Sequence, residues 1–459
     1  MSHPSLHTPH EDTICALATA PGGALGIIRV SGPRALVAVS SICRNDVTAF
    51  SANTIHYTHI VNGGEVIDEV MVSIFRAPHS YTGEDSVEIS CHGSRYIINN
   101  VLELLVQHGC RMAGPGEFTM RAYLNGKMDL SQAESVADLI ASTNKATHQL
   151  AMSQLRGGFS SELSRLREQL LKLTSLLELE LDFSDHEALE FADRSERLSV
   201  TKEIDSRVIS LAQSFEAGQV IKQGIPVAIV GKTNVGKSTL LNTLLKDDRA
   251  IVSNIHGTTR DTIEEAIDLN GVQFRFIDTA GIRQTQDEVE KIGIDRTLQK
   301  VKEARIVIWL LDQRPTSGEI DEMHALSEGK RTIYVQNKAD LVDMDHFVPY
   351  IEPLSLISAK KGEGIDNLKR RIYEEAEQAG LTTNSSDIIV TNARHYDALL
   401  RAHDSIHRVL DGLDQHLSGD LLSEDLRQAL SCLAEITGQG QITTNEVLGN
   451  IFKNFCVRK

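Results

Sequence analysis

Apolar residues follow a helical spacing in two long stretches of the 459-residue chain that contain no proline, one between Pro115 and Pro226 and one after Pro353. Proline inside a helix removes a hydrogen bond and clashes with the preceding turn, so its absence permits long helices. Residues 396–413 and 421–436 show the spacing with charged residues between the apolar ones. In the first stretch the apolar stripe consists of Leu163, Leu166, Leu170, Leu173, Leu177 and Leu181. The pattern predicts two helical regions that pack as a bundle.

Between the helical regions, residues 224–378 alternate β-rich apolar runs with helical patterns, which is typical of a parallel α/β sheet. The first hundred or so residues instead carry short β-rich runs separated by glycine-containing turns. We therefore predict a multidomain chain of α+β and α/β class. Its parts are an N-terminal α+β domain (1–125), a discontinuous helical domain (126–222 and 380–459), and an inserted domain (223–379) with a mainly parallel sheet and flanking helices.

The composition narrows the possible functions. The formal net charge of −17 argues against a general nucleic-acid coat, although a basic patch on one domain remains compatible with it. The six cysteines contain no Cys-x-x-Cys pair, so neither a zinc site nor a disulfide framework is predicted. No stretch approaches the roughly 20 apolar residues of a membrane-spanning helix. These features favour a cytoplasmic protein with reduced thiols.

The segment Gly231-Lys-Thr-Asn-Val-Gly-Lys-Ser238 has the pattern of a phosphate-binding P-loop. It follows a predicted strand and opens a predicted helix, which is the context that such a loop requires. Its backbone N–H groups and the helix N-terminus favour phosphate oxygens. We expect Lys237 to reach the β- and γ-phosphates and the Ser238 hydroxyl to bind Mg²⁺. Taken alone, the pattern is also compatible with a structural glycine turn.

Two further elements weaken that alternative. Asp278-Thr-Ala-Gly281 follows the strand predicted at 274–277, where Asp278 can hold Mg²⁺ through water and the Gly281 amide can contact the γ-phosphate. Between this element and the P-loop lies Gly257-Thr-Thr-Arg-Asp261. A threonine hydroxyl in this run can complete the magnesium shell, and we assign that role to Thr259.

The identity of the base is indicated by Asn337-Lys338-Ala-Asp340, which follows the strand predicted at 332–335. The Asp340 carboxylate can accept hydrogen bonds from guanine N1–H and the exocyclic amine, whereas adenine offers no such pair of donors. The backbone of Ser358-Ala359-Lys360 can contact the guanine carbonyl oxygen. The sequence thus predicts a GTP-hydrolysing enzyme, and an ATP-using transporter or helicase subunit is disfavoured.

Hydrolysis requires a group that orients water. Many signalling GTPases place a glutamine after the Asp-x-x-Gly element, but this chain has Ile282 there. The nearest carboxylates are Asp287, Glu288 and Glu290, although a solvated run of charges explains their spacing equally well. Arg260, Arg283, Arg296 and a monovalent cation bound by Asn234 are the alternatives for neutralising charge at the γ-phosphate.

The chain resembles the MnmE (TrmE) family of tRNA-modification GTPases over nearly its full length. The resemblance rests on the P-loop, the 257–261 run, Asp278-Thr-Ala-Gly-Ile-Arg283 and Asp287-Glu-Val-Glu-Lys-Ile-Gly293. It extends to Ser80-Tyr-Thr-Gly-Glu-Asp85, Gly114-Pro-Gly-Glu-Phe118 and Asn125-Gly-Lys-Met-Asp-Leu130. It implies that Glu290 orients the catalytic water and that the nucleotide domains dimerise. It also implies that K⁺, bound by Asn234, Ser253, Ile255 and Thr258, replaces an arginine finger.

Motifs and resemblance together give the predicted GTP site. Its members are Asn234, Val235, Gly236, Lys237, Ser238, Thr239, Ser253, Asn254, Ile255, His256, Gly257, Thr258, Thr259, Asp278, Thr279, Ala280, Gly281, Asn337, Lys338, Asp340, Ser358, Ala359 and Lys360. Mg²⁺ is assigned to Ser238 and Thr259.

The resemblance also implies a second site. The family's N-terminal domain binds a reduced folate of the 5,10-methylenetetrahydrofolate type, and the matching positions are Arg29, Glu88, Lys127 and Lys459. A homodimer that joins the FAD-containing partner MnmG, as a heterotetramer or larger complex, would install an aminomethyl-type or carboxymethylaminomethyl-type group on C5 of the wobble uridine U34 of certain tRNAs. A binding switch without modification chemistry is the alternative function.

The C-terminus departs from the family pattern. The family ends in Cys, an aliphatic residue, Gly and Lys, whereas this chain ends in Cys456-Val-Arg458-Lys459. Arg458 therefore replaces a glycine, which would add bulk to a tight backbone path. Cys456 is a candidate for the modification chemistry, and a plain structural cysteine at a frayed terminus is the alternative. Prenylation is disfavoured by the Arg-Lys ending.

Overall fold

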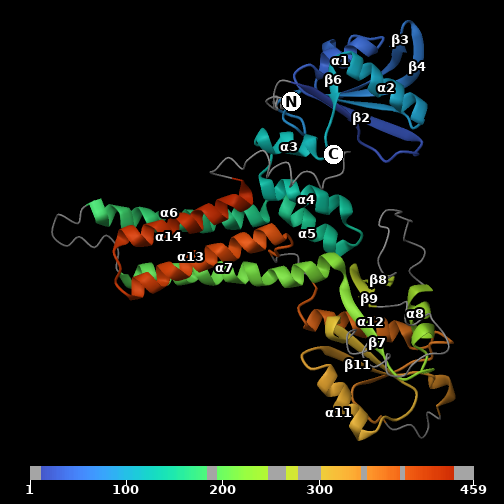
Figure 1. Cartoon of the computed structure of the whole chain (residues 1–459). Coiled ribbons are helices and arrows are strands. Elements are labelled where there is room, and N and C mark those ends of the chain that lie inside the picture. The colour runs from blue at the N-terminus through green and yellow to red at the C-terminus, as the bar shows by residue number, and fades with distance from the viewer. Residues whose placement is uncertain are drawn as a thin grey trace, which may run out of the picture. The chain divides into compact units, whose positions relative to one another are not determined.

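The computed structural model describes residues 12–182, 194–246, 265–277, 301–342, 349–382 and 388–438. The chain forms two compact units (Figure 1). One consists of Met1–Ala141, Met152–Asp205 and Arg401–Lys459, and the other of Ser142–Ala151 and Ser206–Leu400. The domain limits that the sequence suggests, at residues 125, 222 and 379, stay a prediction.

The N-terminal sheet has six strands in the order β3-β4-β5-β2-β1-β6. Neighbouring strands are antiparallel except for β1 and β6, which are parallel. Apolar and polar residues alternate along β2, and this alternation decides which face of the sheet is buried. Ile28 and Val30 lie in the core beneath α1 and α2, while Arg29 points to the opposite face. The elements are β1 Thr13–Leu17, β2 Leu25–Ser31, α1 Ala35–Ile42, η1 Val47–Ala49, β3 Thr54–Asn62, β4 Glu65–Phe75, β5 Ser86–His92, α2 Arg95–Gln107, β6 Cys110–Met112 and α3 Glu117–Leu124.

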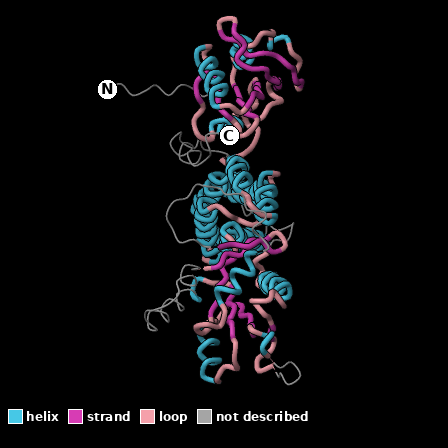
Figure 2. Tube along the Cα trace, turned by 90° about the vertical axis from the view of Figure 1, so that its right-hand side faces the viewer, coloured by secondary structure: helices cyan, strands magenta, loops and turns pink. Residues whose placement is uncertain are grey.

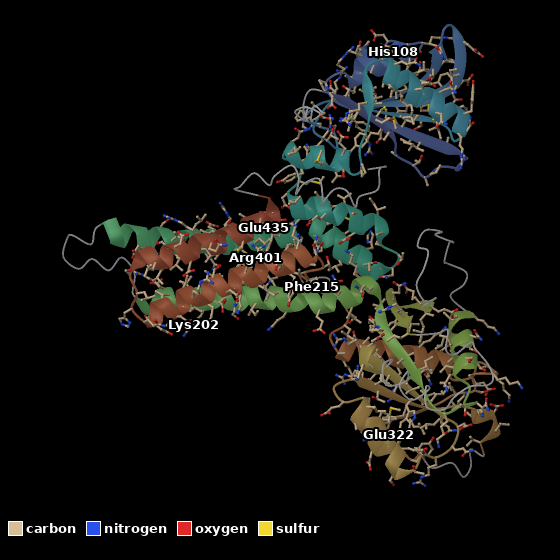
Figure 3. The ribbon with its side chains drawn as sticks, in the orientation of Figure 1. His108, Lys202, Phe215, Glu322, Arg401 and Glu435 are labelled. Carbon is tan, nitrogen blue, oxygen red and sulfur yellow. The ribbon has the colours of Figure 1, made fainter. Side chains whose placement is uncertain are left out.

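Helices make up two parts of the sequence, one directly after the N-terminal domain and one near the end of the chain. Leu163, Leu166, Leu170, Leu173 and Leu177 are buried along α6, as the leucine spacing predicts. On the exposed surface of the helices, Arg401 of α13 forms an ion pair with Glu435 of α14 at 2.9 Å (Figure 3). The helices are α4 Leu130–Ala141, α5 Lys145–Leu155, α6 Gly158–Asp182, α7 Arg194–Gln223, α13 Ala393–Asp414 and α14 Gly419–Thr437.

The second sheet has the order β12-β11-β10-β7-β9-β8 and is parallel except for the edge strand β8. Every residue of β7 and β10 is buried because helices cover both faces, α8 and α12 on one and α11 on the other (Figure 2). The elements are β7 Ile225–Val230, α8 Lys237–Lys246, β8 Glu265–Leu269, β9 Val272–Phe276, β10 Ile306–Leu311, α11 Ser317–Leu326, β11 Arg331–Gln336, η2 Ala339–Leu341, β12 Leu354–Leu356 and α12 Ile365–Gln378. The predicted fold class is confirmed.

A cluster of charges around the buried Arg121 connects helix α3, strand β6 and the loop at Glu84 to the residue before β1. The Arg121 guanidinium, which is fully buried, pairs with Asp12 at 2.6 Å, Glu117 at 3.1 Å and Glu84 at 3.2 Å. Arg111 contacts Asp12 at 2.7 Å and Glu117 at 2.6 Å from the other side. Three carboxylates therefore surround two guanidinium groups, and each charge has a partner of opposite sign.

Glu117 makes the stability of this cluster depend on pH. Burial alone would raise the pKa of Glu117, but hydrogen bonds from Arg111 and the Gly114 amide, with the charges of both arginines, lower it below the ordinary value of 4.5. A carboxyl whose pKa is depressed by folding stabilises the fold above its unfolded pKa. That stabilisation is lost as the pH falls through the folded pKa.

We expect Glu117→Gln to destabilise the N-terminal domain by about 3 kcal/mol at pH 7, because it leaves two guanidinium groups short of a carboxylate. Below pH 4.5, the difference from the unmutated protein should shrink as its carboxyl becomes protonated. Calorimetric unfolding of the full chain at pH 7 and near pH 4 measures both effects. Glu103→Gln, at an exposed position on α2, is the control. An equal loss at both pH values would contradict the linkage.

Candidate functional site

The P-loop leaves the buried strand β7 through backbone that only glycine tolerates at two positions. Gly231 has a φ of 153°, and a Cβ there would lie 2.3 Å from the Leu310 carbonyl oxygen. Gly236 has a φ of 101°, and its Cβ would lie 2.3 Å from Asn337 Nδ2. The two glycines therefore permit contacts with β10 and with the residue after β11 that a side chain would block.

Lys237 begins α8, and its amine lies within the loop. Its Nζ donates to the carbonyl oxygens of Gly231 at 2.7 Å and Lys232 at 2.6 Å. Ser238 and Thr239 follow in the first turn of α8, where the N-terminus of the helix and its dipole favour an anion. Val235 is buried, whereas Asn234 is exposed with a φ of 60°. The backbone and side chains together form a concentration of N–H donors suited to phosphate.

Asn337 joins the P-loop to the elements that follow β11 and β12. Its side chain is only 3% exposed. Its Nδ2 donates to the Val235 carbonyl oxygen at 2.8 Å, and its Oδ1 accepts from the Ala359 amide at 3.0 Å. The Asn337 carboxamide thus holds together the P-loop, the residues after β11 and the residues after β12, which are far apart in sequence.

Asp340 lies in the short helix η2 and is held by Ser358. The Ser358 hydroxyl donates to Asp340 Oδ1 at 2.7 Å. This hydrogen bond lowers the pKa of Asp340 below its ordinary value, so the group is an anionic acceptor at neutral pH. The Ala339 amide donates to the Ile357 carbonyl oxygen at 2.9 Å, which places η2 beside the 358–360 segment. Lys360 is exposed at the end of that segment.

The structure thus brings together the predicted residues of the P-loop, of 337–340 and of 358–360. Asn337 links the predicted phosphate loop to the segment that carries Ser358, which holds the predicted base acceptor Asp340. The rest of the predicted site lies outside the described residues, as do Lys459 and Cys456. It comprises Ser253, Asn254, Ile255, His256, Gly257, Thr258, Thr259, Asp278, Thr279, Ala280, Gly281 and Glu290.

Of the predicted folate residues, the structure describes Arg29 and Glu88 on the N-terminal sheet and Lys127 just after α3. Arg29 of β2 and Glu88 of β5 are directly opposite in the strand register, and Arg29 Nη2 lies 2.6 Å from Glu88 Oε1. The Arg29 guanidinium carbon also lies 5.3 Å from the centre of the Tyr81 ring and 5.6 Å from that of Phe118. Lys127 Nζ donates to the Pro78 carbonyl oxygen at 2.8 Å. Arg29 and Lys127 therefore both contact the 78–83 loop.

Three neighbours of these sites are absent from the sequence prediction. Tyr81 and Phe118 lie within the motifs that carry the family resemblance, but only the fold places their rings beside Arg29. Asp312, which contacts Lys338 at 2.7 Å, follows the strand β10. The rule that the carboxyl ends of adjacent parallel strands share one edge was the signal that could have found it.

Comparison with known proteins identifies the family of the chain. A model of the MnmE helical domain matches residues 130–456, and a model of the GTP-binding protein TrmE N-terminus matches residues 13–127. A tRNA modification GTPase MnmE of Phocaeicola vulgatus is 52% identical over 98% of this chain and 99% of its own length. This chain belongs to the MnmE family of tRNA modification GTPases. It is accordingly a GTP hydrolase.

Other MnmE relatives are similar over the same extent. The protein of Bacteroides thetaiotaomicron is 52% identical over 98% of this chain and 100% of its own length. The MnmE of Flavobacterium johnsoniae is 48% identical with the same coverage. Among solved structures, the G domain of the T. maritima FeoB iron transporter covers 33% of this chain at 26% identity with a TM-score of 0.24. The helices within the described part of the chain include none with the length and apolar character of a membrane span.

We expect Asn337→Ala to weaken GTP and GDP binding together by roughly 30-fold, because it removes two hydrogen bonds that hold the P-loop and the 358–360 segment. Fluorescence titration with labelled GDP and GTP measures the change. Asn367→Ala is the control, since Asn367 of α12 is exposed and accepts from its neighbour Arg370 at 2.6 Å. Unchanged affinities in the Asn337 variant would show that the P-loop holds its shape without it.

Proposed function

We propose that this chain is a potassium-dependent GTPase that acts with an FAD-containing MnmG partner to modify C5 of U34 in certain tRNAs with a folate one-carbon unit. The observation that supports it most is the Asp340 carboxylate, held by Ser358 and joined through Asn337 to the P-loop. An acceptor of this kind, held next to a phosphate-binding loop by Asn337, selects guanine.

In this proposal the P-loop backbone and Lys237 bind the phosphates, and Ser238 and Thr259 bind Mg²⁺. Asp278 holds the ion through water and the Gly281 amide contacts the γ-phosphate. The resting position of Lys237 supports its role, since the two carbonyl oxygens that hold its amine are part of the phosphate loop itself. A phosphate oxygen would replace these acceptors.

Hydrolysis is assigned to Glu290 and a potassium ion. Ile282 cannot hydrogen-bond water, so Glu290 orients the nucleophile in place of a glutamine. Asn234, Ser253, Ile255 and Thr258 hold K⁺ near the phosphates, where it neutralises charge that develops in the transition state. The exposed Asn234 side chain at the apex of the P-loop supports this assignment.

The folate proposal rests on chemistry that the N-terminal domain offers. The Arg29 and Glu88 side chains are 18% and 25% exposed, so their polar atoms are both accessible and paired. A carboxylate can accept from the N–H groups of a pterin ring, and a guanidinium beside aromatic rings provides a planar, charged surface. Lys127 and Lys459 supply positive charge for the acidic tail of the cofactor. When bound, a methylenetetrahydrofolate-type molecule supplies the one-carbon unit.

The proposed assembly is a cytoplasmic homodimer bound to MnmG as a heterotetramer or larger complex. A tRNA substrate carries many phosphates, whereas the chain has a net charge of −17. Contacts with tRNA are therefore confined to local basic patches or supplied by the partner. GTP hydrolysis drives conformational change in the complex, and Cys456 is the proposed residue of the modification chemistry.

The potassium role gives one prediction. GTP turnover should be roughly 100-fold faster in K⁺ than in Na⁺, because an oriented charge at the γ-phosphate lowers the barrier to that extent. Asn234→Ala should lower the rate in K⁺ to the rate in Na⁺ without changing GDP affinity. Steady-state kinetics in the two salts at equal ionic strength provide the measurement. Equal rates of the unmutated protein in both salts would remove the assigned role of Asn234.

The proposed role in tRNA modification gives a second prediction. Cells that lack the gene should lose the modified wobble uridine, and the unmutated gene should restore it. Arg29→Met and Glu88→Gln should fail to restore it and should weaken 5-formyltetrahydrofolate binding, while their GTP turnover stays unchanged. Nucleoside mass spectrometry and calorimetry measure the two effects. If deletion leaves the tRNA nucleosides unaltered, the chain acts as a switch and the proposal is wrong.

A further inference from the structure

Asp312 stands beside the guanine-selecting residues, although it belongs to none of the sequence motifs. Its Oδ2 lies 2.7 Å from Lys338 Nζ. The strand register explains this placement, because Leu311 of β10 pairs with Gln336 of β11 in parallel. The Asn337 amide then donates to the Leu311 carbonyl oxygen at 2.7 Å, so the chain after β11 stays next to Asp312.

The backbone at Lys338 has an unusual conformation. Lys338 has a φ of 59°, which lies in the left-handed region. Residues other than glycine and asparagine seldom adopt this backbone conformation. Strained backbone of this kind persists where the surroundings hold it and is frequent at binding sites. Here the amides on either side, of Asn337 and Ala339, are both hydrogen-bonded to neighbouring strand ends. These bonds hold the backbone of Lys338 beside the end of β10, and the ammonium group on its flexible stem pairs there with Asp312.

A lysine near the carboxylate that binds the base can form an ion pair with it and so block it. Lys338 is two residues from Asp340, and its flexible side chain is long enough to reach that carboxylate in a tight turn. An ion pair between them would occupy an acceptor that guanine N1–H and the exocyclic amine need. In the structure the groups are separated, since Lys338 pairs with Asp312 and Asp340 accepts from the neutral Ser358 hydroxyl.

We propose that Asp312 is a positioning residue for guanine recognition, which holds the Lys338 ammonium away from the Asp340 carboxylate. The inference rests on the proposed role of Asp340 as the acceptor for the base. Asp312 acts through Lys338 and does not touch the nucleotide itself.

An ordinary surface ion pair is the competing explanation. The Lys338 and Asp312 side chains are 39% and 24% exposed, and pairs with this exposure add little to stability. A structural role predicts a small and uniform effect on every nucleotide. The positioning role predicts a change in base selectivity, which a general loss of stability would not produce.

Inosine diphosphate is the probe that separates the two explanations, because it differs from GDP only in lacking the exocyclic amine. The unmutated protein should prefer GDP by about one hydrogen bond to a charged acceptor, roughly 10- to 100-fold. In Asp312→Asn, the freed Lys338 pairs with Asp340, and the GDP-to-IDP affinity ratio should fall roughly tenfold. The KM for GTP should rise with little change in kcat.

A second variant tests the route through Lys338. Adding Lys338→Met to Asp312→Asn removes the ammonium while keeping an unbranched stem, so the affinity ratio should return toward the unmutated value. Glu375→Gln is the matched control, since Glu375 pairs with Arg331 at 3.8 Å elsewhere in the same unit. It should leave the ratio unchanged. All titrations use the full-length chain, with its unfolding temperature recorded for each variant.

The outcomes distinguish this inference from the function on which it rests. If Asp340→Asn retains full preference for GDP over IDP, the assignment of Asp340 to the base is wrong. If Asp340→Asn loses the preference while Asp312→Asn keeps it, only the role of Asp312 is wrong. An equal loss of GDP and IDP affinity in Asp312→Asn, or a lowered ratio that Lys338→Met does not restore, also overturns the role of Asp312.

Discussion

The pair of hydrogen bonds made by the Asn337 side chain is the constraint on which the nucleotide site depends. One bond reaches Val235 in the P-loop and the other reaches Ala359 beyond β12. The same side chain lies so close to Gly236 that a Cβ at this glycine would be 2.3 Å from Nδ2. The proposed phosphate loop and the proposed base acceptor are therefore held at a fixed separation, which would suit a ligand whose base and phosphates are joined covalently.

Much of this arrangement follows from local sequence rules. The spacing of leucines located α6, and the run Gly231 to Ser238 located the turn between β7 and α8, because glycine, lysine and serine each have a local role there. In the N-terminal domain, the β-rich runs indicated the class, but not the pairing of β1 with β6, which depends on contacts between residues almost 100 positions apart.

Partners brought together only by tertiary structure could not be predicted in this way. Asp312 and Lys338 are 26 residues apart, and Arg29 and Glu88 are 59 residues apart. Their pairing is decided by strand order and register, which no motif encodes. The resemblance to MnmE assigned Arg29 and Glu88 to one site, whereas the rings of Tyr81 and Phe118 beside Arg29 emerge only from the fold.

The buried charge cluster of the N-terminal domain has a consequence for how that domain folds. Arg121 donates two of its hydrogen bonds to Asp12, 109 residues earlier in the chain. Until the start of β1 is in place, the guanidinium lacks those partners, and burying it would be costly. The first strand, the loop at Glu84 and helix α3 must therefore become ordered together. The domain is expected to form in a single cooperative step whose nucleus includes both ends of its sequence.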